Sequence, residues 1–381
     1  MEFRDLKRQY HALREEITHR TERILEESRF IGGREVTELE AKLADYVGVK
    51  HCITCGNGTD ALTLMLTAEG IGKGDAVIVP DFTFFATAEA VSRTGAVPVF
   101  VEPEENGFNL SVEGVEREIR RVSEEGSLCP RAILAADLFG VPANYPALAG
   151  VAEKYKMLLF EDAAQSFGGS IGEKMAGSFG MAAAVSFFPS KPLGCYGDGG
   201  AVFTNDGTAA ERIRSLKEHG RGESKYDNLR IGCNSRLDTV QAAVLLAKLA
   251  AYKRYEREAA QQVADMYSQK LFTAAMVLPK IPEDFRSAWA QYTVILSGPG
   301  ERSRLQAALQ AKKIPSMVYY PRPLSLQRAY KALQTPEAIS ERTQWLCDRV
   351  LSLPFYPYMT ETEVDSVCRV CREFSRNETV W

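Results

Sequence analysis

The sequence has little of what metal sites, membranes and nucleic acids require. Its 381 residues include only four histidines, which are scattered along the chain, and no apolar run approaches the roughly 18 residues needed to cross a bilayer. The formal net charge of -4 excludes an overall attraction for nucleic acid or an anionic membrane. Residues 1–30 are rich in charge and lack the apolar segment of a secretory signal. We therefore expect a cytoplasmic protein, in which any anionic ligand binds a local group of arginines.

The eight cysteines include two C-x-x-C pairs, a spacing that also occurs in zinc sites. Cys52 and Cys55 lie in a strand pattern, where odd spacing places the two thiols on opposite faces. Cys368 and Cys371 share one face of a predicted helix, but no histidine is near them in the sequence. The pattern predicts free thiols in a reducing compartment and no metal site.

Apolar runs of strand length alternate with helical patterns over most of the chain. Such alternation predicts an α/β fold with a mostly parallel central sheet covered on both faces. A chain of this length is too long for one compact core. We predict N-terminal helices and a large domain over residues 1–255, and a small C-terminal α+β domain over residues 256–381. The predicted strands are 51–55, 76–79, 97–101, 132–135, 158–160, 182–187 and 201–203 in the large domain, and 292–296 and 314–320 in the small one.

A lysine and an aspartate stand out from this pattern. Pro192 disfavours the helical conformation at Lys191, and the Gly-Asp-Gly-Gly turn at residues 197–200 then reverses the chain. Asp162 ends a buried strand pattern, at the edge of the sheet where open α/β folds bind ligands. Pyridoxal phosphate (PLP) requires a lysine for a Schiff base and a carboxylate beside its ring nitrogen. The pair therefore predicts a PLP enzyme.

A glycine-rich segment suggests a rival interpretation. Residues 56–61 read Gly-x-Gly-x-x-Ala between a strand and a helix, as a dinucleotide-binding fingerprint does. Asp81 ends the next strand, about where a ribose-binding acid would stand. An NAD-dependent enzyme is therefore an alternative, but it leaves Lys191 and Asp162 without a role.

The same segment would serve the single phosphate of PLP equally well. The start of a helix offers free N–H groups to an anion, here at Gly58, Thr59 and Asp60. Ser186, just before the lysine loop, would add a hydroxyl. Phe84 follows the next strand and would stack on a pyridine ring.

Together these segments resemble the DegT/StrS-type sugar aminotransferases, which are PLP enzymes of the aspartate aminotransferase fold (fold type I). The similarity runs from the first predicted helix to about Pro357. It implies a large domain with a mostly parallel sheet and a smaller C-terminal domain. Within the family, the chain is most similar to enzymes that aminate the 3-keto group of a UDP-linked 2-acetamido-glucuronic acid for surface polysaccharide. The most specific segments are 56–62, 161–168, 186–200 and 232–243.

The resemblance also implies roles for individual residues. Lys191 is the Schiff-base lysine, Asp162 the partner of the ring nitrogen, and Gln165 the residue near the phenolic oxygen. Asn234 and Arg236 correspond to positions that reach the active site of the neighbouring subunit, which implies a homodimer. The predicted cofactor-binding residues are Gly58, Thr59, Asp60, Phe84, Asp162, Gln165, Ser186, Lys191 and Asn234. The predicted substrate-binding residues are Arg34, Arg236, Tyr319, Tyr320 and Arg322.

The implied reaction moves an amino group from a donor, glutamate, onto a keto-sugar nucleotide, and the cofactor passes through its pyridoxamine phosphate form. A 4-keto nucleotide-sugar aminotransferase of the same family is an alternative. Two other classes are sugar dehydratases, in which a histidine usually replaces the lysine, and PLP-binding regulators, which normally carry a DNA-binding module. The nucleotide, the position of the ketone and the donor stay open at this level.

Overall fold

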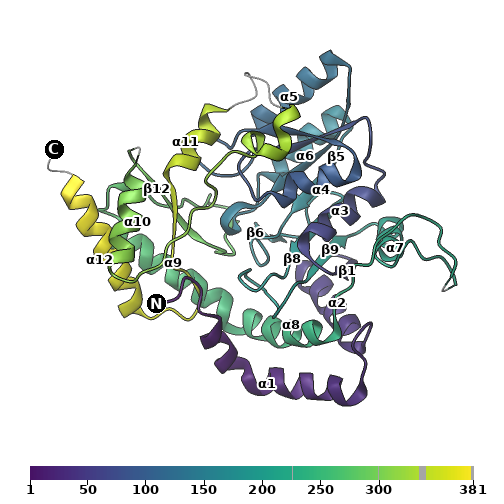
Figure 1. Ribbon diagram of the computed structural model, residues 1–381, viewed down its shortest axis with the longest axis horizontal. Helices are drawn as coiled ribbons and strands as arrows, with labels where there is room; N and C mark the ends of the chain where they lie inside the picture. The colour runs from purple at the N-terminus through teal and green to yellow at the C-terminus, as the bar shows by residue number, and fades with distance from the viewer. Residues whose placement is uncertain (225, 299, 334–339, 379–381) are drawn as a thin grey trace.

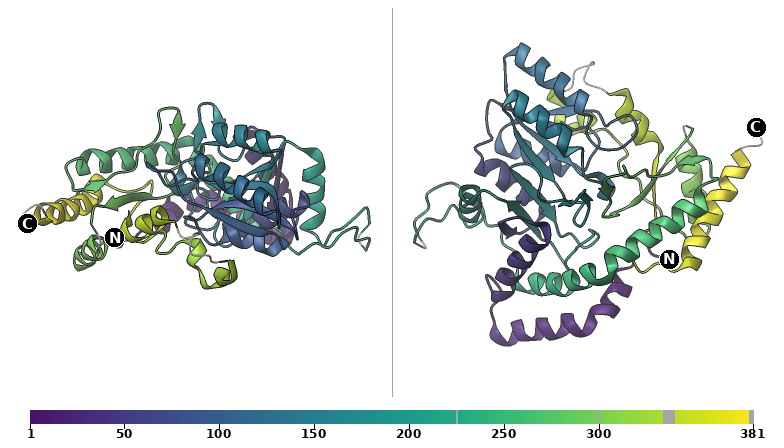
Figure 2. Two further views of the ribbon diagram at one scale, coloured as in Figure 1. Left: turned by 90° about the horizontal axis from the view of Figure 1, so that it is seen from above. Right: turned by 180° about the vertical axis from the view of Figure 1, so that it is seen from behind.

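The structure is a computed structural model that describes residues 1–224, 226–298, 300–333 and 340–378. A larger part holds the central sheet, and the C-terminal helices gather beside it (Figure 1). The long helical segment α8 and α9 runs from one part to the other (Figure 2). None of the helices in the described ranges combines the length and apolar character that a membrane span needs.

All seven strands predicted for the large domain form one sheet, in the order β1-β9-β8-β5-β4-β2-β3. Strand β9 runs antiparallel to β1 and β8, and the other neighbouring strands are parallel. The predicted α/β fold is therefore confirmed. The strands are β1 (His51–Cys55), β2 (Asp75–Pro80), β3 (Val97–Val101), β4 (Cys129–Ala136), β5 (Leu158–Asp162), β8 (Ala182–Ser186) and β9 (Gly200–Thr204).

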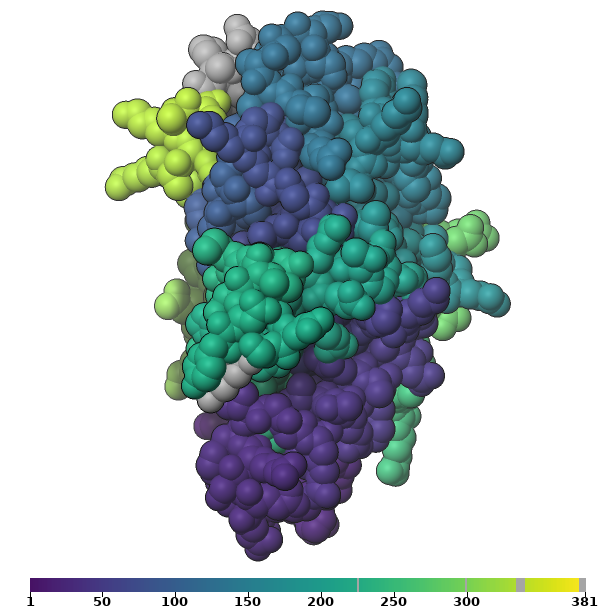
Figure 3. Space-filling view, turned by 90° about the vertical axis from the view of Figure 1, so that its right-hand side faces the viewer, coloured from purple at the N-terminus to yellow at the C-terminus, as the bar shows by residue number. Residues whose placement is uncertain are grey.

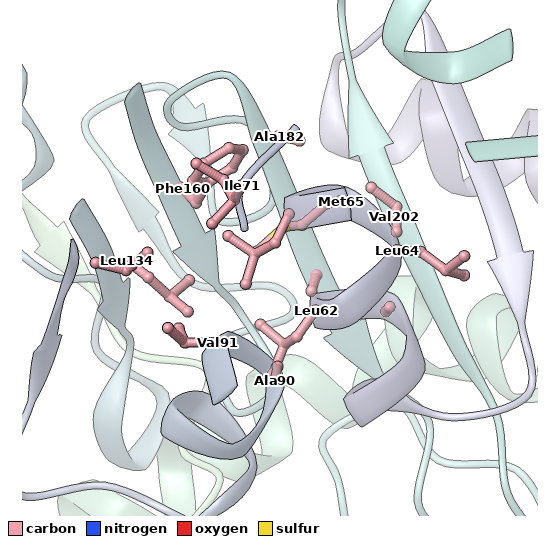
Figure 4. Packing of buried hydrophobic residues seen from close by; sticks show 14 of the residues in the cluster. Leu62, Leu64, Met65, Ile71, Ala90, Val91, Leu134, Phe160, Ala182 and Val202 are labelled. Carbon is pink, nitrogen blue, oxygen red and sulfur yellow. The ribbon is translucent and has the colours of Figure 1, made fainter. Parts of the chain in front are cut away.

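Helices cover both faces of this sheet. One face packs against α3, α4 and α7, and Figure 4 shows side chains of α3 and α4 lying against those of β4, β5, β8 and β9. The other face packs against α2 and α8 at one half and against α5 and α6 at the other. Cys52 and Cys55 enter the cores on opposite faces, as predicted. The helices are α2 (Arg34–Val47), α3 (Gly58–Ala68), α4 (Ala86–Thr94), α5 (Val112–Glu125), α6 (Tyr145–Tyr155), α7 (Gly207–Leu216) and α8 (Thr239–Ala251).

The first helix is α1 (Leu6–Glu27). The Asp5 side chain accepts hydrogen bonds from the N–H groups of Lys7 and Arg8, which satisfies two donors of the first turn. Ile17 of α1 packs against Val244 of α8. The N-terminal segment is thus attached to the helix that leads out of the large part.

Helix α8 continues through a π-helical turn, η2 (Tyr252–Glu256), into α9 (Arg257–Leu271). The predicted division of the chain between residues 255 and 256 falls in this turn and stays a prediction. The C-terminal part has its own apolar core, between Ala260 and Cys371 in the sequence. Its other elements are β10 (Met276–Val277), β12 (Tyr292–Leu296), α10 (Glu301–Ala311), α11 (Glu341–Arg349), β13 (Val350–Leu353) and α12 (Glu361–Glu378).

One predicted strand is wrong. Strands β10, β12 and β13 form an antiparallel sheet, but residues 314–320 contribute a single bridge, from Met317 to Ser352. Pro315 has no N–H to donate, and the single bridge lies at the outer edge of β13. Three short strands that the sequence did not predict form a further sheet: β6 (Ser170–Ile171), β7 (Lys174–Met175) and β11 (Phe285–Arg286).

Candidate active site

A cavity of about 460 Å³ lies where the parallel strands β2, β4 and β5 end. Its size is within the range that small-molecule sites occupy, roughly 300–1,000 Å³. Residues from seven separate parts of the sequence line it. The predicted site residues among them are Gly58, Thr59, Phe84, Asp162, Gln165, Ser186, Lys191, Tyr319 and Tyr320.

Lys191 stands on a tightly folded loop between β8 and β9. Its N–H donates to the carbonyl of Phe188 at 2.9 Å. The chain passes so close to itself that a Cβ on Gly194 would lie 2.5 Å from that same carbonyl oxygen. Burial lowers the pKa of the Lys191 amine to about 8; the charge of Asp162 opposes this shift and that of Arg4 adds to it. The amine can therefore be neutral close to physiological pH.

Asp162 ends β5 with its carboxylate buried in the cavity wall. One oxygen accepts a hydrogen bond from the Thr87 hydroxyl at 2.7 Å, and the other accepts from the N–H of Ala164 at 3.2 Å. Burial raises the pKa of Asp162, while these two donors and the charge of Lys191 oppose the rise. A buried carboxylate of this kind is stabilised by a cation. The protonated ring nitrogen of PLP is such a cation, so this residue fits the cofactor.

The beginning of α3 forms an anion site. The Asn57 side chain caps the helix by accepting from the N–H of Asp60 at 2.8 Å. A Cβ on Gly58 would lie 2.7 Å from the Cβ of Ser186, so the helix and the end of β8 are in direct contact here. Thr59 and Ser186 bring their hydroxyls to the cavity wall beside this helix end. The N-terminus of a helix favours negative charge, and this one fits a phosphate.

Aromatic and amide groups complete the wall. Phe84 is 56% exposed, whereas its neighbour Phe82 is fully buried, so Phe84 is the ring available to a ligand. Gln165 accepts from the backbone N–H of Phe139 at 2.9 Å and donates to the Tyr320 hydroxyl at 3.1 Å. Burial raises the pKa of Tyr320, which keeps its hydroxyl protonated.

The cavity therefore offers what PLP needs: an amine, a buried carboxylate, an anion site and an exposed ring. Residues 11–372 match the family model described as the DegT/DnrJ/EryC1/StrS aminotransferase family. The chain belongs to this family. It is a PLP-dependent sugar aminotransferase, as the resemblance of its sequence implied.

Two relatives and one solved structure illustrate the similarity. UDP-2-acetamido-2-deoxy-3-oxo-D-glucuronate aminotransferase of Pseudomonas aeruginosa is 41% identical over 370 residues, which cover 97% of this chain and 98% of the relative. UDP-N-acetyl-3-dehydro-alpha-D-glucosamine 3-aminotransferase of Acidithiobacillus ferrooxidans is 38% identical and covers 97% and 96% of the two chains. The crystal structure of a DegT DnrJ EryC1 StrS aminotransferase from Brucella abortus is 46% identical, with a TM-score of 0.95 over 98% of this chain and 99% of that one. Other relatives are named for dTDP- and GDP-linked sugars.

The dinucleotide alternative is wrong for this aminotransferase. Asp81, which would have bound a ribose, is 1% exposed. Its carboxylate accepts from the backbone N–H of Ser325 at 2.7 Å. The Gly-x-Gly-x-x-Ala segment matches because any anion at a helix N-terminus needs close backbone approach, whether the anion is a diphosphate or a single phosphate.

Asp60 of the aminotransferase lies behind the anion site rather than in the cavity wall. It does not line the cavity with the other described residues. Its N–H is taken by Asn57, and its carboxylate accepts from the Ser235 hydroxyl at 2.7 Å. Ser235 also accepts from the N–H of Gly56. In this structure Asp60 holds the beginning of α3, and its contact with the cofactor stays a prediction.

Four predicted binding residues lie away from the lysine. Arg34 forms ion pairs with Glu27 and Glu35 on the surface of the aminotransferase. Asn234, Arg236 and Arg322 are exposed. None of these four described residues lines the cavity that contains Lys191. Figure 3 shows the green segment that follows α7, in which Asn234 and Arg236 lie, standing out on the surface.

The sequence did not indicate two basic side chains behind the lysine loop, the partly buried Arg4 and the buried Lys248. Arg4 donates to the carbonyl of Lys191 at 3.0 Å, and burial lowers the pKa of its guanidinium to about 10. Lys248 of α8 is 1% exposed and donates to the carbonyl of Gly194 at 2.7 Å. Arg4 and Lys191 are 187 residues apart, and no local pattern predicts such a contact.

In the part of the chain that the structure describes, no three His, Cys, Asp or Glu side chains gather as a metal site would require. Cys368 and Cys371 lie in the apolar core of the C-terminal part.

Proposed function

We propose that this aminotransferase transfers an amino group from glutamate onto the C3 ketone of a UDP-linked 2-acetamido sugar, a uronic acid, for surface polysaccharide. The names of the two UDP-sugar relatives support this choice of substrate. Glutamate as the donor follows from the resemblance of the sequence to the family. The relatives named for dTDP- and GDP-sugars, and the 4-keto alternative, define the competitors that an experiment must separate.

The observation that carries the proposal is the presence of Lys191, Asp162 and the α3 anion site in one cavity. When bound, PLP supplies an electron sink for removal of a proton from the carbon that bears the amino group. Lys191 is the residue that takes up and returns this proton, because its pKa near 8 suits both directions at neutral pH. Asp162 holds positive charge on the cofactor ring.

The remaining residues bind and orient. Thr59 and Ser186 donate their hydroxyls to the cofactor phosphate at the start of α3, and Phe84 covers one face of the ring. Gln165 is oriented by its hydrogen bonds to the backbone of Phe139 and to Tyr320, so its amide stays aimed at the cavity. These assignments are part of the proposal.

A homodimer is the second part of the proposal. The segment that carries Asn234 and Arg236 projects from the surface, and its apolar side chains Leu229 and Ile231 are 62% and 95% exposed. Exposed apolar side chains of this kind are typical of an interface. In the dimer, Asn234 and Arg236 would reach the cavity of the neighbouring subunit, where an arginine suits a diphosphate or a sugar carboxylate.

Two measurements test these assignments. Borohydride reduction of the PLP-loaded protein, followed by peptide mapping, is expected to place the cofactor on Lys191; a tag on another lysine, or none, would contradict the site. PLP-loaded protein with glutamate is then offered 3-keto and 4-keto sugars linked to UDP, dTDP and GDP, and products are identified by mass. Amination of a 4-keto sugar alone would refute the proposed substrate but leave the site intact.

A further inference from the structure

The loop that carries Lys191 is held from behind by two basic side chains, the partly buried Arg4 and the buried Lys248. Arg4 donates to the carbonyl of Lys191 at 3.0 Å, and Lys248 donates to the carbonyl of Gly194 at 2.7 Å. The first comes from the N-terminal segment and the second from α8. Hydrogen bonds from charged donors are about twice as strong as neutral ones, so these two contacts fix the backbone on which the amine stands.

A buried carboxylate acts on these two basic side chains. Glu256, in the π-helical turn η2, is 1% exposed and accepts from Gln9 at 2.9 Å and from the Tyr358 hydroxyl at 2.5 Å. Its charge acts on both Arg4 and Lys248. Arg4 and Glu256 therefore carry opposite charges behind the lysine loop, whereas burial lowers the pKa of Lys248 to about 7, so that its amine can donate in the neutral form.

The N-terminal segment that supplies Arg4 is attached on both sides. Phe3 accepts a backbone hydrogen bond from Phe355 of the C-terminal part at 3.0 Å, and its ring lies 6.3 Å from that of Tyr319 in the cavity wall. Arg8 forms two hydrogen bonds, at 2.6 and 2.8 Å, with Glu363. Arg4 is thus held in place by contacts that do not involve Lys191.

Few charges act on the Lys191 amine directly. Asp162 of β5 favours its protonated form, and Arg4 favours the neutral form, in the same direction as burial. Lys248 and Glu256 act on Arg4 from α8 and η2. The other titratable groups that line the cavity are Asp137, Asp198, Tyr319 and Tyr320.

We propose that Arg4 is a positioning residue of the aminotransferase reaction: it fixes the backbone of Lys191 through its carbonyl, and its charge favours the neutral, reactive amine. The inference rests on the proposed role of Lys191. Arg4 touches neither the substrate nor the reacting atoms; it acts through Lys191. Removing its charge should leave the amine protonated to higher pH, and removing its donor should loosen the loop.

The test uses the cofactor-free full-length protein, so that it does not depend on turnover. Lys191 is labelled with formaldehyde and cyanoborohydride at a series of pH values, and the labelled peptide is quantified by mass spectrometry. In the parent protein the midpoint is expected near pH 8. Amide hydrogen exchange of residues 188–197 reports on the loop.

Three variants separate charge from hydrogen bonding. Arg4→Met is expected to raise the labelling midpoint by roughly half a pH unit or more, because a nearby cation is lost, and to speed amide exchange. Arg4→Gln keeps a donor, so it should shift the midpoint with less effect on exchange. Arg4→Lys keeps the charge and should restore the midpoint. Lys7→Met removes an exposed charge from the same segment and is the matched control.

In the PLP-loaded enzyme, Arg4→Met is expected to lower kcat about tenfold with the KM for the ketosugar unchanged, as for a misplaced catalytic group. If Arg4→Met does not fold, Arg4→Gln and Arg4→Lys carry the test. An unchanged midpoint in Arg4→Gln, with parent-like exchange in a folded protein, would overturn the proposal. If borohydride tags a lysine other than Lys191, the proposed site fails instead, and the two failures are distinguishable.

Discussion

Burial shifts the pKa values of the two central residues, Asp162 and Lys191, in opposite directions. It raises the pKa of Asp162 and lowers that of Lys191, because a low-dielectric environment disfavours both charged forms. Their mutual attraction opposes both shifts. A bound cofactor with a cationic ring and an aldehyde matches this arrangement, since the ring stabilises the carboxylate and the aldehyde reacts with the neutral amine. The same buried cavity thus prepares Asp162 to bind a cation and Lys191 to react as a neutral amine.

Replacement of Asp162 by asparagine tests the charge alone. The amide keeps the shape of the side chain, but it cannot hold a positive charge on the ring. We expect Asp162→Asn to retain cofactor bound through Lys191 and to lose roughly 10²–10³ in kcat, the loss typical of one electrostatic group. Thr87→Val, which removes only a hydrogen bond to the carboxylate, should lose much less. The measurement is kcat, with the cofactor content of each variant determined by absorbance. A near-normal kcat in Asp162→Asn would mean that another residue holds the positive charge on the ring.

Lys248 should make stability depend on pH. Burial and, to a smaller extent, the charge of Arg4 lower its pKa from 10.5 to about 7. Between these values the unfolded chain binds a proton that the folded chain does not, so the free energy of unfolding rises with pH, by up to about 1.4 kcal/mol per pH unit. Lys248→Met should remove this slope. Urea unfolding of both proteins at about pH 7, 8 and 9 measures it, and parallel profiles would contradict the expectation.

At the scale of elements, the contact between the start of α3 and the end of β8 builds the phosphate site. The absence of a side chain at Gly58 allows Ser186 to lie beside the first turn of the helix. Asn57 caps the same turn and leaves other N–H groups of the turn available to an anion. Gly200 of β9 is equally close to Asn57, so three elements meet at this point.

Gly58→Ala should therefore weaken cofactor binding. Its Cβ would lie 2.7 Å from that of Ser186, which forces the helix away from the strand. We expect the affinity for PLP to fall about tenfold or more, equivalent to about 1.4 kcal/mol. Gly150→Ala is the matched control: it lies in α6 with open space around it. It should stabilise the fold by about 0.5–1 kcal/mol and leave PLP affinity unchanged. Fluorescence titration with PLP measures the cofactor affinity of each variant, and urea unfolding measures its stability. Equal PLP affinities for Gly58→Ala and the parent protein would reject the proposed role of the contact between α3 and β8.

At the scale of the whole molecule, the proposed dimer has a measurable consequence. Lys191→Ala and Arg236→Ala should each be nearly inactive. In a mixed dimer one site carries both changes and the other carries neither, so the purified mixed dimer of the two variants should recover about half of the parent activity. The dimer is isolated with two different affinity tags and assayed against each variant alone. No recovery in a purified mixed dimer would mean that Arg236 does not serve the neighbouring subunit.

The central sheet was predictable because its strands are short apolar runs separated by helical patterns. Residues 314–320 had a similar composition and still failed to form a strand: at the outer edge of β13 they make a single bridge, from Met317 to Ser352, and Pro315 has no N–H to donate. The glycine-rich segment indicated an anion site but not which residues line it. Asp60 follows Gly58 by two positions, yet it turns toward Ser235, outside the cavity.

By itself, the sequence determined where the strands of the large sheet lie along the chain, and it placed Asp162 at the end of one strand and Lys191 on a loop between two others. Local patterns of apolar residues, glycine and proline suffice for that. Only the tertiary structure decided the charge environment of the amine. Arg4 and Lys248 reach the lysine loop from distant parts of the chain, and burial and electrostatic fields depend on which segments meet rather than on which residues are neighbours in sequence.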